Sequence, residues 1–78
     1  MIRKNPASIK AKFGAMVRKR RAEMGLSQEQ VAERADLHRT YIADIERGSR
    51  NVSLENIEKI AIALEIPVST IFKDMEKT

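Results

Sequence analysis

Apolar residues recur at helical spacing along most of the chain, and residues that favour helix ends separate one repeat from the next. The first repeat follows Asn5-Pro6, since proline is favoured at the first position of a helix. It ends before Gly25, which can adopt the left-handed conformation that closes many helices. The pattern therefore predicts a helix over about 6–24. Its apolar positions are Ile9, Phe13, Met16, Val17 and Met24.

Two short helices separated by a turn are predicted next. Ser27 is a favourable N-cap, and Gln30 stands three residues later, where its side chain can complete a capping box. A helix is therefore expected over about 28–34, and another over about 39–47, ending before Gly48. The residues expected to face the interior are Val31, Ala32, Ala35, Ile42 and Ile45.

The last third of the chain predicts two more helices. Ser53 can cap a helix that ends at Pro67, and a short helix carrying Ile71 and Phe72 is expected over about 69–75. The apolar repeat of the longer helix is Leu54, Ile57, Ile60, Ala61 and Leu64. No strand-like alternation and no long linker interrupts the pattern. The sequence therefore predicts an all-α fold of five helices in a single domain over 1–78.

The composition excludes several kinds of chemistry. The 78 residues include no cysteine and one histidine, which excludes a disulfide framework, a thiolate or multi-histidine metal site and a thiol nucleophile. No positioned acid–base set stands out, so we expect neither an enzyme nor a bound cofactor or metal. No apolar run approaches the ~18 residues of a membrane span, and the first residues lack the apolar core of a signal peptide. A cytoplasmic protein is therefore expected.

Basic residues concentrate near the start of the chain. The net charge is +4, and residues 1–24 carry eight lysines and arginines but a single glutamate. The remaining residues carry seven basic and ten acidic side chains. Such an asymmetry suggests an end that faces a polyanion, although a solvated basic helix would give the same pattern.

The clearest functional pattern is the unit over 27–48, which consists of two short helices and a turn. In a helix-turn-helix, the second helix lies in the major groove of DNA and presents side chains to base edges. A rotation of ~100° per residue, with Ile42 and Ile45 inward, turns the opposite face of that helix toward the groove. The residues on that face are Arg39, Thr40, Ala43 and Asp44. Such side chains can contact guanine, the thymine methyl group and cytosine. Two short helices and a turn also occur in many unrelated folds, so spacing alone leaves DNA binding open.

A longer motif resembles a known family. Residues 27–72 read SQEQVAERADLHRTYIADIERGSRNVSLENIEKIAIALEIPVSTIF. This stretch, and the chain from about Met16 to Met75, is similar to the Cro and phage-repressor (XRE-type) helix-turn-helix family, which implies a lambda-repressor-like fold. The block from Arg39 to Asn51 further resembles the controller proteins of restriction–modification systems, and similar blocks occur in general XRE-type regulators.

The resemblance assigns roles position by position. It places the four groove-facing residues on the family's base-reading positions and pairs Glu46 with Arg21 as a structural tie. The residues that it implies at the DNA backbone are Gln28, Ser49, Arg50 and Asn51. His38, Tyr41 and Arg47, in and next to the second short helix, are also expected at the backbone from their own positions. Two positions depart from the family pattern. Asp36 stands where the family prefers glycine in the turn, and His38 replaces the usual serine or aspartate cap.

The resemblance implies a transcription regulator that binds a pseudo-palindromic operator in double-stranded DNA as a homodimer. A restriction–modification controller that regulates its own promoter fits this pattern, and RNA polymerase is a further expected partner. Because the other helices are assigned to DNA and to the core, the dimer interface is expected within the segment over about 64–75. Its expected residues are Ile66, Val68, Ile71 and Phe72. The alternatives are an antitoxin, a general XRE-type repressor, and a basic module that binds RNA or an anionic membrane.

Overall fold

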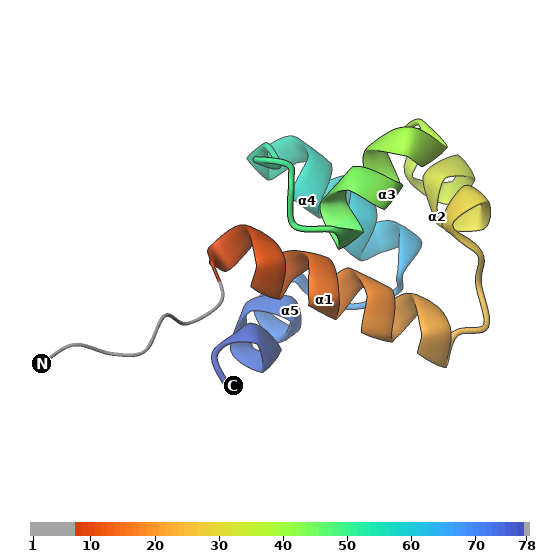
Figure 1. Cartoon of the computed structure of the whole chain (residues 1–78). Helices are drawn as coiled ribbons and strands as arrows, with labels where there is room; N and C mark the ends of the chain where they lie inside the picture. The colour runs from red at the N-terminus through yellow and green to blue at the C-terminus, as the bar shows by residue number, and fades with distance from the viewer. Residues whose placement is uncertain (1–7, 78) are drawn as a thin grey trace, which may run out of the picture.

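Five α-helices connected by short turns make up most of residues 8–77, the part of the chain that the computed structural model describes (Figure 1). The helices are α1 (Ile9–Glu23), α2 (Gln28–Ala35), α3 (Arg39–Glu46), α4 (Leu54–Ala63) and α5 (Val68–Met75). No strand occurs within these residues, which confirms the predicted all-α fold of five helices. Among the described helices, none is long and apolar enough to cross a membrane.

Serine side chains fix the starts of three helices. Ser8, Ser27 and Ser53 each accept a hydrogen bond from the backbone N–H three residues further along the chain. At Ser27, the Gln30 side chain accepts the reciprocal bond from the backbone N–H at 2.8 Å, which completes the predicted capping box. The start of α1 is set by Ser8, whereas the expected start at Asn5-Pro6 lies outside the described residues.

The end of α4 differs from the prediction. Glu65 adopts the left-handed region with φ 53°, and the Ile66 backbone N–H donates to the Ala61 carbonyl at 3.1 Å. This arrangement closes the helix at Ala63, as left-handed residues after helices commonly do. Pro67 was expected to end α4, but it stands at the N-cap of α5.

The core gathers the apolar sides of all five helices. Its buried apolar residues are Phe13, Met16, Val17, Val31, Ala32, Ala35, Ile42, Ile45, Ile60, Ala61, Ala63, Leu64, Ile71 and Met75. Two predicted apolar-face residues lie outside the core, since Ile9 is 65% and Leu54 is 79% exposed. Ile9 is the first residue of α1. Leu54 is the first residue of α4 and points ~120° around the helix from buried Ile60.

α3 is held by two other helices. α1 packs against α3 and α5, while α2 packs against α3 and α4 (Figure 1). A Cβ atom placed on Gly14 of α1 would lie 2.1 Å from the carbonyl oxygen of Ile45, so only glycine permits this approach. The packing fixes the inner side of α3 and leaves its outer side open.

Candidate nucleic-acid interface

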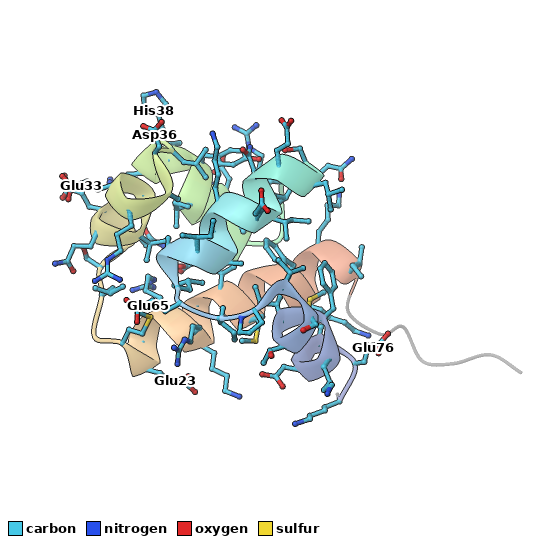
Figure 2. The ribbon with its side chains drawn as sticks, turned by 180° about the vertical axis from the view of Figure 1, so that it is seen from behind. Glu23, Glu33, Asp36, His38, Glu65 and Glu76 are labelled. Carbon is cyan, nitrogen blue, oxygen red and sulfur yellow. The ribbon has the colours of Figure 1, made fainter. Side chains whose placement is uncertain are left out.

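The turn between α2 and α3 relies on Asp36. This residue adopts the left-handed conformation with φ 59° and ψ 46°, and the following Leu37 N–H donates to the Ala32 carbonyl at 2.9 Å. Aspartate tolerates this conformation better than most residues, so it serves in the turn position that the family gives to glycine. His38, the N-cap of α3, makes no side-chain capping bond and projects into solvent beside Asp36 (Figure 2).

The outward face of α3 is the candidate DNA-reading surface. Its residues are Arg39 and Thr40, which are exposed, and Ala43 and Asp44, which are partly exposed. Ile42 and Ile45 on the inner side are 0% and 1% exposed. A shallow hollow at the start of α2 adjoins this face and is lined by Arg21, Ser27, Gln28, Glu29 and Arg39. The Arg39 guanidinium beside the N–H groups of a helix start suits an anion such as a DNA phosphate.

The inner end of α3 is tied to α1 by Glu46 and Arg21, the pair that the resemblance implies. Arg21 donates from Nε to Glu46 Oε2 at 2.7 Å and from Nη2 to Glu46 Oε1 at 2.9 Å. The carboxylate side chain is 5% exposed and the guanidinium side chain 19%. Arg21 Nη1 also donates to the Leu26 carbonyl at 3.0 Å. These bonds join α1, the loop after it and α3 into one unit.

Gln28 belongs to the same network, which the sequence did not reveal. Its Nε2 donates to Glu46 Oε1 at 3.0 Å. Gln28 was expected at a DNA phosphate, and one amide hydrogen is therefore engaged inside the protein. The second hydrogen of the amide can still reach a phosphate.

The charge state of Glu46 follows from these contacts. Burial alone would raise its pKa, but hydrogen bonds from Arg21 and Gln28 and the charges of Arg21 and Arg18 outweigh burial. The pKa of Glu46 is therefore lowered, and the hydrogen bond to Glu46 raises the pKa of Arg21. The pair is ionised at neutral pH.

A second arginine–carboxylate cluster lies on the outer side of α3. The Asp44 carboxylate pairs with Arg47 through Oδ1 and with Arg50 through Oδ2, the latter at 3.3 Å from Nη2. The Arg50 guanidinium carbon lies 4.8 Å from the centroid of the Tyr41 ring. Asn56 of α4 donates from Nδ2 to the Tyr41 hydroxyl at 3.0 Å. Two expected DNA-backbone residues, Arg47 and Arg50, thus bind Asp44, the residue expected to read a base, and a third, Tyr41, packs against Arg50.

The loop after α3 closes that helix as well as facing outward. The Ser49 backbone N–H and its hydroxyl both donate to the Asp44 carbonyl at 3.0 Å. Ser49 is expected at a phosphate, and both of its hydrogen-bond donors are engaged with the end of α3 in this structure. Arg50 and Asn51, the other two expected loop residues, are exposed.

Comparison with known proteins identifies the family. A helix-turn-helix family model matches residues 17–71. The control protein C.MunI of a Mycoplasma species is 51% identical over 70 residues, which cover 88% of this chain and 95% of that protein. The chain belongs to the helix-turn-helix family and, within it, to the restriction–modification controller proteins.

Solved structures agree with this assignment. The controller protein C.AhdI from Aeromonas hydrophila superposes with a TM-score of 0.79 at 48% identity, covering 81% of this chain and 96% of that one. The controller C.Esp1396I, solved as a tetramer in complex with its natural 35 base-pair operator, gives a TM-score of 0.84 at 35% identity. That match covers 92% of this chain and 95% of the other. The family's members are transcription regulators, which agrees with the expected function.

Two basic side chains, Arg20 of α1 and Arg34 of α2, stabilise the fold by binding carbonyl groups at the end of α4. Arg20 donates from Nε to the Leu64 carbonyl at 2.9 Å and from Nη2 to the Glu65 carbonyl at 3.3 Å. Arg34 donates to the Ala63 carbonyl at 3.2 Å. Both arginines satisfy carbonyl groups at the end of α4, whose last turn contains no basic residue of its own. Sequence reasoning missed this role, although a helix end without basic residues or glycine leaves its carbonyls in need of donors.

The four residues expected at the dimer interface differ in burial, and Ile71 does not fit the expected role. Ile71 is 1% exposed, and Ile66 and Phe72 pack partly against the core, because α5 covers α1 and α4. An Ile71 in the core cannot lie at the centre of an interface. Of the four expected residues, Val68 alone counts as exposed, at 36%.

Exposed apolar residues lie on the outer face of α4 instead. Leu54 is 79% and Ile62 70% exposed. Leu54 also borders a shallow groove together with Val68 at the start of α5, and the groove is completed by Glu55, Ile57 and Glu58. Apolar side chains gathered in this way mark a candidate contact surface.

Proposed function

We propose that this protein regulates transcription by binding a pseudo-palindromic operator in duplex DNA as a homodimer, with α3 of each subunit in the major groove. The observation that carries the proposal is the construction of α3. Its inner side is fixed by the Gly14 contact and the Arg21–Glu46 pair, while its outer side presents Arg39 and Thr40. A rigidly mounted helix with polar residues outward is what base readout requires.

Base reading in this proposal falls to the outward residues nearest the start of α3. Arg39 can bond guanine with two hydrogen bonds, and Thr40 and Ala43 can contact thymine methyl groups. The backbone contacts come from residues on either side, including the exposed His38 and Arg47 and the partly exposed Gln28. Such contacts position the helix without reading sequence.

The dimer is proposed to form through the outer face of α4. A single recognition helix covers too few base pairs to discriminate against a genome, and a two-fold dimer doubles its contacts. α4 directly follows the loop that carries Arg50 and Asn51, so the start of α4, with Leu54, lies next to that loop. Leu54, Ile62 and Val68 can then meet their counterparts near the operator's two-fold axis.

Regulation follows from protein concentration in this proposal. More protein favours the dimer, and the dimer occupies the operator of its own promoter, where it acts on RNA polymerase. The relative C.Esp1396I is described as a tetramer on its 35 base-pair operator, which supports self-association on operator DNA here. The proposal describes a binding protein rather than an enzyme, and it places the protein in the cytoplasm with its DNA.

Footprinting on the protein's own promoter, followed by a salt titration, tests DNA binding. We expect protection of two half-sites whose centres are about 34 Å apart along the helix axis. The logarithm of the binding constant should fall with the logarithm of salt concentration by about 0.9 for each neutralised phosphate. A response that is flat in salt, or the absence of protection, would contradict the proposal.

Sedimentation of a double variant tests the interface. Leu54→Glu with Ile62→Glu should give a folded monomer, because both side chains are already exposed. A matched control, Ala15→Glu with Ala22→Glu, adds the same charge to exposed positions of α1 and should leave the dimer intact. An unchanged dimer in the α4 variant would place the interface elsewhere. Ile71→Glu should unfold the protein rather than separate two folded subunits.

A further inference from the structure

We propose that Asp44 is a positioning residue that competes with DNA phosphates for Arg47 and Arg50, and does not read cytosine. In the free protein the carboxylate holds both arginines beside α3. In the complex the arginines turn to phosphate oxygens, so Asp44 weakens binding to every duplex and most of all to sequences without an operator. The inference rests on the proposed binding of duplex DNA to this face.

The carboxylate is already occupied on both oxygens. Oδ1 accepts from Arg47, while Oδ2 accepts from Arg50 Nη2 at 3.3 Å and Nε at 3.4 Å. The Asp44 side chain is 18% exposed, whereas those of Arg47 and Arg50 are 64% and 47% exposed. An approaching DNA strand therefore meets the guanidinium groups before the carboxylate. A cytosine amino group would have to displace an arginine to reach Asp44.

Arg50 is also held by contacts outside the ion pair. Its guanidinium lies over the Tyr41 ring at 4.8 Å, within the range of a cation–π contact. The Tyr41 hydroxyl accepts from Asn56 Nδ2 at 3.0 Å, which links the ring to α4. Asp44 and Tyr41 together give the loop arginine a defined place next to the groove-facing surface.

The pairs are weak enough to exchange. The Asp44 side chain is mostly covered, but both guanidinium groups reach solvent. Ion pairs with solvent-exposed partners contribute little to stability, because water solvates the separated guanidinium well. A phosphate oxygen offers each guanidinium an equivalent acceptor. After the exchange, however, the Asp44 charge stays close to the phosphate and repels it. Non-specific binding depends almost entirely on phosphate contacts, so this repulsion weakens it more than it weakens operator binding.

The test compares Asp44→Asn with Asp74→Asn on two duplexes of equal length, the footprinted operator and a scrambled sequence. Asp74 lies on α5, where it pairs with Lys77, and its replacement changes the net charge equally. We expect Asp44→Asn to bind the scrambled duplex about tenfold tighter than the wild type does, and the operator less than about threefold tighter, because binding to the scrambled duplex depends more on phosphate contacts. Asp74→Asn should change either affinity by less than about twofold, as expected for a charge remote from the contact.

Two other outcomes would overturn the role of Asp44. If the carboxylate reads cytosine, Asp44→Asn weakens operator binding and leaves the scrambled duplex unchanged. If it is an uninvolved surface charge, the two variants behave alike. A wild-type protein that binds neither duplex would instead contradict the proposed function itself, so the two failures are distinguishable.

A second measurement tests, in the free protein, whether Asp44 holds the Arg50 side chain over the Tyr41 ring. Tyr41 is the single tyrosine of the chain, so the NMR signals of its ring are unambiguous, and contacts from that ring identify the protons of the Arg50 side chain above it. Ring currents should move the Arg50 side-chain protons upfield in the wild type and in Asp74→Asn. In Asp44→Asn these protons should return toward their ordinary shifts. Unchanged shifts in that variant would show that the carboxylate does not position Arg50.

Discussion

α3 carries two carboxylates two residues apart, and each is paired with arginine in a different environment. Glu46 lies at the inner junction with α1, where it is 5% exposed and receives two bonds of 2.7 and 2.9 Å from Arg21. Asp44 lies on the outer surface, where its bonds to Arg50 are 3.3 and 3.4 Å long and both arginine partners are exposed.

The difference between the two regions shows that burial decides what an ion pair can do. The inner pair joins separate elements and cannot be replaced by water without burying an unpaired charge, so it fixes the orientation of α3. The outer pairs connect α3 with its own end and the next loop, and solvent or phosphate can replace them. One side of the recognition helix is therefore rigid, and the other can exchange partners.

Gly14→Ala should break the inner junction most severely. The added Cβ would lie 2.1 Å from the Ile45 carbonyl oxygen, so α1 and α3 must move apart. Overpacking of this kind costs about 3 kcal/mol or more, which exceeds the gain of about 1 kcal/mol from removing glycine from a helix. Chemical denaturation measures the free energy of unfolding. Ala15→Gly, at the exposed neighbouring position, provides the propensity term alone, and a stabilised Gly14→Ala protein would contradict the close approach.

Glu46→Gln should be the next most damaging change. It removes the charge that faces Arg21 and leaves a largely buried guanidinium without its counter-ion, at a cost of about 3 kcal/mol. Glu33→Gln is a matched control on the exposed side of α2 and should cost about 0–0.5 kcal/mol. Thermal unfolding measures both variants, and equal small effects would show that Glu46 is not a structural residue.

The same pair gives stability a pH dependence that serves as a second check. The pKa of Glu46 is lower in the folded protein than its ordinary value of 4.5. Its stabilisation is therefore complete above that ordinary value and is lost as the pH falls through the lower folded pKa. The wild type should lose melting temperature in this acidic range more steeply than Glu46→Gln does.

The sequence predicts the helices and the inner junction well because both depend on short-range patterns. Capping serines and apolar spacing place α2 and α3 within a residue or two of their observed bounds. The resemblance to the family pairs Arg21 with Glu46, and the two side chains are in contact in the structure. The left-handed Asp36 also follows from its place in that motif.

The errors arise where a residue's role depends on what another helix covers. Nothing in the spacing of Ile71 distinguishes a core position from an interface position, and the packing of α5 on α1 and α4 decides it. Likewise, Arg20 belongs to a run of basic residues that looks like a polyanion site, but the carbonyls that it reaches lie 44 and 45 residues away in the chain. Helical rotation placed Asp44 outward correctly, yet it gave no indication that the loop after α3 would bring Arg50 back to it.

Arg39→Ala tests the outer surface directly. Loss of a bidentate contact to guanine should cost about 1–3 kcal/mol at one base pair in each half-site and relax the preference there. Arg50→Ala is the comparison, since a lost phosphate contact should weaken all sequences alike and reduce the salt slope by about 1 per site. Binding to a set of operators with single base-pair changes separates the two. If Arg39→Ala kept its sequence preference, base reading would have to come from other residues.

The smallest expected effect concerns the bond that joins the outer cluster to the scaffold. Tyr41→Phe removes the hydroxyl that accepts from Asn56 Nδ2 but keeps the ring beneath Arg50. Asn56→Ala removes the donor. Each change should cost about 0.5–1.5 kcal/mol of unfolding free energy, as single hydrogen bonds do. Together they should cost less than their sum, because both delete the same bond, and a double-mutant cycle measures that coupling. Strict additivity would mean that the bond contributes nothing, and the outer surface of α3 would then depend on its own ion pairs alone.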